Sequence, residues 1–465
     1  MTLQLALLIA YSVALVGIGL WVGHRVRSAR DFFVAGRRLP AFLVFATVLA
    51  ANIGAGSTVG AASLGYRDGL GAWWWNGSAG IGSVLLALWI GPRIWREARR
   101  HEFLTLGDFL EHRYGRAVRG TVGILLWLVT PFILAGQVIG AASILGTVAG
   151  VPRPAGAAAA VAVMFAYFAA GGLLSSAWVN LVELLVLLVG FAIAAPMAIG
   201  AAGGTGALAA AAHTPPAFTS LWQGSASLTW LALLGPAFIV SPGLIQKAYG
   251  AIDERAIRIG IGASGAALMI FGFLPPLVGM AARVLHPDLP NADLALPTVL
   301  AHDLPPVAGS LALAAVLSAE ISSADAILFM LATSLSQDLY RRFVRPGATD
   351  RTVLRVARSA AAAGAGIALL LALVLPTVVD ALRIFYSVLT VVLFVPVVAA
   401  IHSRRAGRLE ALVSIAGGLA VMVGSALVFG PQGIGGWNPA LLGLGASALA
   451  FAAILLGSGR RARPA

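Results

Sequence analysis

The chain has 465 residues, of which 59% are hydrophobic and only 11% are charged. A water-soluble protein carries about 25% charged residues, so this composition excludes an ordinary soluble globule. The chain has no cysteine, which excludes disulfides and Cys-ligated metal centres. Its net charge of +13 could indicate nucleic-acid binding, but the placement of the basic residues, given below, favours contact with anionic membrane lipids and no nucleic acid.

Apolar stretches of roughly 20 residues follow one another along the chain, which is the length that a helix needs to cross a bilayer. They predict an all-α polytopic membrane protein. We expect about thirteen spans, at 3–22, 41–66, 72–95, 120–149, 155–175, 179–200, 228–248, 258–282, 306–338, 356–378, 382–402, 408–429 and 439–457.

One transmembrane domain over residues 1–465 accounts for this pattern. Residues 1–40 would form an extra N-terminal span with a basic cytoplasmic loop, and residues 41–402 would form the core. Residues 403–465 would add two C-terminal spans and a basic tail.

The basic residues give the expected orientation. If the N-terminus is outside, all but four of the 31 Lys and Arg residues lie in inner loops or the adjacent helix ends. The four exceptions are Arg67, Arg153, Arg283 and Arg383. This asymmetry follows the positive-inside rule and predicts a bacterial-type inner membrane protein with a cytoplasmic C-terminus.

Two spans carry residues that interrupt helices. The second span reads Ala-Ala-Asn-Ile-Gly-Ala-Gly over 50–56, and the seventh has Pro236 and Pro242, each beside a glycine. Such breaks expose backbone carbonyls and amides. Because the two spans are five apart, and an odd offset reverses direction, spans 2–6 and 7–11 could form an inverted repeat. Ordinary glycine packing and a proline kink are the alternative.

Few acidic residues fall at membrane depth, where a carboxylate indicates function by default. They are Glu183, Glu320 and Asp325. In the ninth span, Ala319, Ser322 and Ser323 share one helix face. Hydroxyls, carbonyls and a nearby carboxylate are hard oxygen ligands that suit an alkali cation. The alternative is that the serines bond back to their own helix.

Other polar residues near the midplane are Asn52, Gln137, Asn180 and Tyr386, of which Gln137 and Tyr386 are candidate solute contacts. We interpret the run Trp73–Trp75 as an interfacial belt. The sequence has no His-Glu-x-x-His pattern, so we expect a carrier and not an enzyme.

Four stretches carry a family resemblance over nearly the whole chain: Asp31–Arg37, Ala50–Ile53, Thr105–Leu110, and Ser322–Asp325 followed by Gln337–Tyr340. With these stretches the chain resembles the sodium:solute symporter family. The resemblance implies a LeuT-like fold of five-plus-five inverted repeats. It also implies a sodium-coupled symporter that imports a small organic solute by alternating access, with Na⁺ as the coupling ion and no obligate protein partner.

The resemblance also implies site residues. Its shared sodium site matches backbone carbonyls of Ala50, Ile53 and Ala319 and the hydroxyls of Ser322 and Ser323. Solute contacts fall just after the first break and in the seventh span. With the midplane residues they give the candidate set Asn52, Gly56, Ser57, Gln137, Ala237, Phe238 and Tyr386.

One position departs from the family pattern. Where many members have an Asp linked to a second cation or a proton, this chain has Asn180, and Asp325 lies on the opposing helix. We expect a second cation or proton site among Asn180, Asp325, Ser322, Ser323 and Glu320. The alternatives are that Asp325 only hydrogen-bonds Asn180, or that the carrier is proton-coupled with Glu320 or Asp325 titrating.

Overall fold

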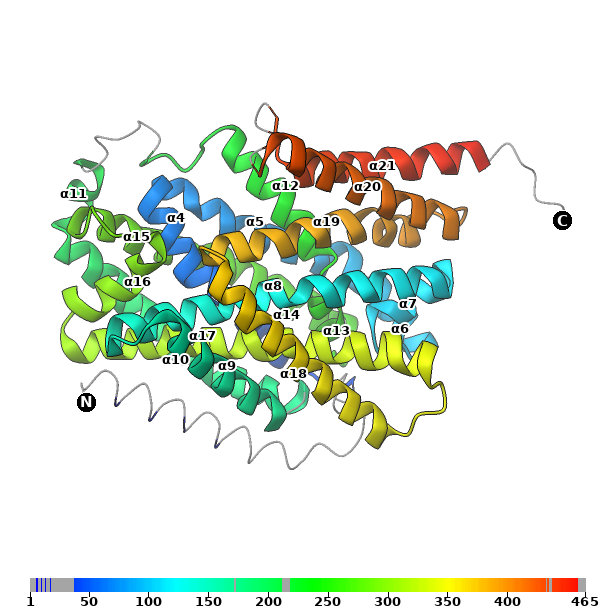
Figure 1. The fold of residues 1–465 in the computed structure, drawn as a ribbon, viewed down its shortest axis with the longest axis horizontal. Helices are drawn as coiled ribbons and strands as arrows, with labels where there is room; N and C mark the ends of the chain where they lie inside the picture. The colour runs from blue at the N-terminus through cyan, green and yellow to red at the C-terminus, as the bar shows by residue number, and fades with distance from the viewer. Residues whose placement is uncertain are drawn as a thin grey trace.

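The computed structural model describes residues 37–170, 173–210, 218–431, 433–434 and 437–458, with four single positions in the first 36 residues. Within these residues the protein is helical, and its β-structure consists of two isolated bridges, Leu39 with Ala251 and Ile434 with Trp437. Figure 1 shows α8 and α17 running lengthwise through the bundle, while α20 and α21 lie together along one edge. The expected first span, 3–22, lies outside the described residues.

The described helices of the first half begin with α3 and end with α11. Their bounds are α3 Ala41–Asn52, η2 Gly56–Gly60, α4 Ala61–Asp68, η3 Gly69–Ala72, α5 Trp73–Leu85, η4 Leu86–Ile90, α6 Gly91–His101, α7 Leu106–Tyr114, α8 Arg116–Ala149, α9 Arg153–Ala170, α10 Leu173–Ala201 and α11 Gly204–Ala210.

The second half contains the helices from α12 to α21. Their bounds are α12 Ser225–Ile239, α13 Pro242–Tyr249, α14 Glu254–Phe271, α15 Leu274–Leu285, η5 Ala292–Leu294, α16 Ala295–Thr298, η6 Val299–Asp303, α17 Pro306–Thr333, η7 Ser334–Val344, α18 Asp350–Val374, α19 Val378–His402, α20 Arg408–Phe429 and α21 Pro439–Ser458.

Ten helical stretches of the described residues are long and apolar enough to cross a membrane, and Ala41–Asn52 and Arg153–Phe168 are shorter apolar helices. Within the described residues, each expected span from 41–66 onward is mainly helical. The number differs from the expected one partly because Gly56–His101 continues as a single helical stretch from the end of the expected span 41–66 through the whole of 72–95. Gly69 turns the chain there with φ of 70°, where a side chain would clash with the Phe218 carbonyl.

Burial separates central from peripheral helices. In the most apolar part of the α17–η7 stretch 89% of residues are buried, against 22% in α20 and α21. Large apolar side chains such as Leu427, Val374 and Leu456 are more than three-quarters exposed. A chain with so many exposed aliphatic side chains needs lipid around it. The helix α17 is therefore the axis of the bundle.

Two interruptions divide helices at the centre. Helix α3 ends at Asn52, Ile53 is extended (φ −99°, ψ 98°), and helix resumes at Gly56. Helix α12 ends at Ile239, and α13 begins at Pro242. A proline lacks the N–H and disfavours a helical residue before it, so the second interruption follows from the sequence.

Candidate functional site

Oxygen atoms from α3 and α17 meet where α3 ends. Ser322 Oγ donates to the Ala50 carbonyl at 3.2 Å, and Ser323 Oγ lies 3.3 Å from the same carbonyl and 3.2 Å from that of Ala51. Ser322 Oγ is also 3.4 Å from the Ala319 carbonyl. The last carbonyls of a helix have no intrahelical partner, which leaves those of α3 open to side chains. The structure thus brings together Ala50, Ala319, Ser322 and Ser323.

Ile53, the fifth residue of the expected set, directly follows the last residue of α3, and its side chain is fully buried. Beside it, a side chain at Gly54 would clash with Ser323 and Gln137. The absence of a Cβ at Gly54 therefore allows α17 to approach the broken backbone closely.

A small cavity of about 30 Å³ lies beside these oxygens, and Ser323, which supplies one of them, is part of its wall. Six of the seven expected solute contacts line it: Asn52, Gly56, Ser57, Gln137, Phe238 and Tyr386. Ala237 is fully buried and is not part of its wall. Ligand pockets have volumes of roughly 300–1,000 Å³, so this cavity must expand to hold a solute.

Amide side chains hold the broken segment around the cavity. Gln137 Oε1 accepts from the Ala55 amide at 2.8 Å, and Asn76 Nδ2 donates to the Ser57 carbonyl at 3.1 Å. Asn52 Nδ2 donates to the Ser83 hydroxyl at 3.3 Å. Asn76 is 1% exposed, and its Oδ1 has no partner among the described residues. Asn76 therefore offers an unpaired hydrogen-bond acceptor among the residues of the wall.

Aromatic rings form another part of the wall. Trp75 meets Trp230 edge to face at 5.0 Å between ring centroids and Tyr386 at 6.1 Å, and Tyr386 lies 5.4 Å from Phe238. The belt interpretation is wrong for Trp75, which is 3% exposed and lines the cavity. The spacing of Trp75 and Ala79, one helical turn apart on one face of α5, could have indicated it.

The membrane-depth carboxyl groups occupy two different places. Glu320 is fully buried near Gly140 and Ala55, and neither of its carboxyl oxygens has a partner among the described residues. Asp325 instead lies within electrostatic range of Glu183 and of Lys247. Asn180 donates to the Thr47 hydroxyl at 3.3 Å.

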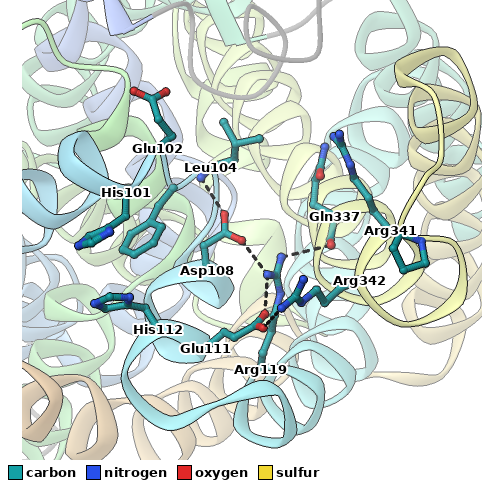
Figure 2. A pocket seen from close by; sticks show the side chains of 12 residues that line it. His101, Glu102, Leu104, Asp108, Glu111, His112, Arg119, Gln337, Arg341 and Arg342 are labelled. Atoms are coloured by element: carbon teal, nitrogen blue, oxygen red, sulfur yellow. Dashed lines mark hydrogen bonds and ion pairs between the residues drawn. The ribbon is translucent and has the colours of Figure 1, made fainter.

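A separate ionic cluster lies at the end of the bundle that carries α7 and the end of η7, which we call the basic end (Figure 2). Arg119 is paired with Asp108 at 2.7 Å, Glu111 at 2.9 Å and Asp338 at 2.9 Å, and Thr105 Oγ1 donates to Asp338 at 2.6 Å. Thr105 and Asp108 also cap α7 reciprocally. Two of the stretches that carry the resemblance therefore meet in one cluster.

The same cluster borders an open pocket of about 480 Å³. Glu111 receives a second ion pair there, from Arg342. Burial alone would raise the pKa of Glu111, but its hydrogen bonds with Arg342 and Arg119 outweigh burial and hold that pKa below its usual range. The wall is polar and charged, unlike that of the central cavity.

The sequence profile of the sodium:solute symporter family matches residues 32–418. The chain belongs to this family. Among its relatives is the sodium/glucose cotransporter of Vibrio parahaemolyticus, 24% identical over 78% of this chain and 73% of the relative. The sodium/pantothenate symporter of Escherichia coli (strain K12) is 28% identical over 73% of this chain and 72% of the relative.

Solved structures share the fold of this symporter-family member. A Na⁺-coupled sialic acid symporter, in a substrate-bound outward-open state, superimposes with a TM-score of 0.77 and 17% identity over 98% of each chain. This family member is thus a multi-pass membrane transporter and not an enzyme.

Proposed function

We propose that this protein is a sodium-coupled symporter that imports a small organic solute by alternating access. The meeting of the Ser322 and Ser323 hydroxyls with the Ala50 carbonyl carries the proposal. The family and the names of its relatives support sodium as the coupling ion.

Sodium fits the residues present. The donors are backbone carbonyls and hydroxyls, which are hard oxygen ligands, and no nitrogen or sulfur atom belongs to the set. Ala50 and Ile53 of α3 would share the ion with Ala319, Ser322 and Ser323 of α17. An ion held there joins two helices that belong to different halves of the core, so its binding changes the balance between their arrangements.

Alternating access is the mechanism that we expect if the core, 41–402, consists of two inverted repeats. The interruption after Asn52 lies in the second expected span and the one before Pro242 in the seventh, so the two would correspond in such a repeat. Transporters with such repeats rock one set of helices against the other around a site at the breaks. The membrane potential adds about 2.3 kcal/mol per charge per 100 mV to inward sodium movement.

The cavity wall constrains the solute class. The side chains that line it include amides, hydroxyls and aromatic rings, and none of them carries a full charge. A solute with a polar group for Asn76 Oδ1 and a flat or apolar part against Trp75 and Tyr386 fits this wall. A negative charge on the solute would be met by the sodium and by the open backbone amides of the breaks.

The remaining predictions concern orientation and a second site. We place the protein in a bacterial-type inner membrane, with the N-terminus outside and the basic end on the cytoplasmic side. We expect it to contact membrane lipid and to need no obligate protein partner. A second cation or proton site at Asn180, Asp325, Ser322, Ser323 and Glu320 stays a prediction. So does the rival coupling to protons through Glu320 or Asp325.

The test is a thermal-shift measurement on the purified chain. We expect sodium to raise the unfolding midpoint and to be required for stabilisation by a solute found in a screen of sugars, vitamins and amino acids. Ser322→Ala and Ser323→Ala should each raise the sodium concentration for half effect at least tenfold. Ser310→Ala is the matched control, because Ser310 is buried in the same helix and bonds only to the Pro306 carbonyl. An equal effect of Ser310→Ala, or none from the other two, would contradict the proposal.

A further inference from the structure

A lysine is buried where four helices of the core meet. Lys247 of α13 is 6% exposed, and its Nζ donates to Thr47 Oγ1 of α3 at 3.2 Å. The same hydroxyl accepts from Asn180 of α10 at 3.3 Å. Helix α13 also packs against α17, and α10 packs against both α3 and α17. The ammonium therefore lies inside the helix junction and not in the aqueous loop that follows α13.

A carboxyl group on α17 faces this ammonium, and a second acidic side chain lies near that carboxyl on α10. Asp325 of α17 is 6% exposed and interacts electrostatically with Lys247. Glu183 of α10 is 1% exposed and interacts with Asp325. A buried carboxylate needs a counter-charge, because the bilayer interior and the packed helices keep water away. In this cluster the chain supplies that counter-charge itself.

The Lys247 ammonium lies close to the place where the sequence predicts a second cation site. Asn180 and Asp325 flank the junction, and Asp325 lies two residues beyond Ser323 on α17. A sodium ion between these residues would share Asp325 with the lysine ammonium. Two cations at one carboxylate repel each other, so a resident ammonium excludes the ion.

We infer that Lys247 is a built-in cation that takes the place of a second sodium beside Asp325, so that the carrier binds one sodium ion. The inference rests on the proposed sodium-coupled function and specifies its stoichiometry. The hydrogen bond from Lys247 to Thr47 also links α13, which follows one helix break, to α3, which ends at the other. The junction is thus neutralised whether or not sodium is bound at Ser322.

The number of bound ions tests the inference directly. ²²Na⁺ binding to the purified full-length protein should saturate at one ion per chain with a Hill coefficient of one. Lys247→Met removes the charge and keeps a long apolar side chain, so a second ion should bind and the Hill coefficient should rise toward two. Lys247→Arg keeps the charge and should stay at one.

A double variant covers the case in which Lys247→Met does not fold. Lys247→Met with Asp325→Asn removes both charges and should bind one ion with the affinity of the unchanged protein within about threefold. Two ions per chain in the unchanged protein, or a folded Lys247→Met that binds one ion with a Hill coefficient of one, would overturn the inference. Absence of all sodium binding in the unchanged protein would instead overturn the proposed function.

Discussion

Small side chains around the end of α3 decide where the central oxygens lie. Gly54 has no side chain, and a Cβ there would occupy the space of Ser323 and of Gln137. Gln137 in turn accepts from the Ala55 amide, which the helix break leaves without a helical partner. The geometry of Ser322 and Ser323 therefore depends on residues that offer no cation ligand themselves.

Asp293, in the short helix η5 outside the spans, gives a prediction at this scale. Burial raises its pKa to about 6, although it accepts from the Val378 amide at 2.8 Å. Because the folded state then holds the proton more tightly, Asp293 favours folding below its ordinary pKa of about 3.9, and this contribution is lost as the pH rises toward about 6.

Asp293→Asn should therefore raise the unfolding midpoint at pH 7.5, by the equivalent of up to about 3 kcal/mol. It should have little effect at pH 4.5, where the native carboxyl is already protonated. The measurement is thermal unfolding at both pH values, with Asp288→Asn, an exposed residue of the same loop, as the control. The same shift at both pH values would contradict this assignment.

Much of the residue-level site could be predicted from the sequence, because it lies in short motifs. Helix periodicity places Ser322 and Ser323 on one face and the break in the second span exposes backbone carbonyls, whereas the choice of Ala50 and Ile53 as ligands came from the family resemblance. Trp75 was not predictable in this way, since a run of three tryptophans also fits an interface. In the sequence, Lys247 lies at the end of an expected span and was grouped with the basic residues of the inner loop that follows. Only the packing of α13 shows that its ammonium points into the helix junction.

At the basic end of the bundle, ion pairs connect the ends of neighbouring helices. Arg119 of α8 links α7 to η7 through Asp108, Glu111 and Asp338, and its side chain is 8% exposed. Arg116, three residues earlier, is 69% exposed and lies 3.6 Å from the same Glu111. The two arginines share Glu111 as a partner but differ in burial and in the number of their ion pairs, so they can be compared in one experiment.

Arg119→Met should lower stability by about 3–5 kcal/mol, because it leaves buried carboxylates without their counter-charge. Arg116→Met should change it by less than about 1 kcal/mol, since exposed ion pairs contribute little. The measurement is thermal or denaturant unfolding in detergent. Asp338→Asn added to Arg119→Met should recover part of the loss, and equal effects of the two arginine substitutions would contradict this account.

At the scale of the elements, the positions of the helices were easier to predict from the sequence than the places where one helix ends and the next begins. The expected spans from 41–66 onward fall on helix because apolar length alone specifies a spanning helix. The continuous stretch Gly56–His101 was not expected, since it depends on how η3 turns at Gly69 against Phe218, a contact between residues far apart in sequence.

At the scale of the whole molecule, the distribution of basic residues predicts the orientation in the membrane. The chain has no cysteine, so single cysteines can be introduced without a background. A membrane-impermeant maleimide added to intact cells should label Thr219→Cys and should label Arg404→Cys only after permeabilisation. Both positions are exposed. The reverse pattern would contradict the positive-inside assignment.

Sodium-driven uptake into proteoliposomes tests the central claim most directly. With the solute identified by the thermal-shift screen, an inward sodium gradient should drive accumulation above the outside concentration, and a negative interior potential should increase it. Replacing sodium by potassium should abolish accumulation, whereas a protonophore without a sodium change should leave it intact. Accumulation that persists without sodium and collapses with the proton gradient would contradict the account and favour coupling through Glu320 or Asp325.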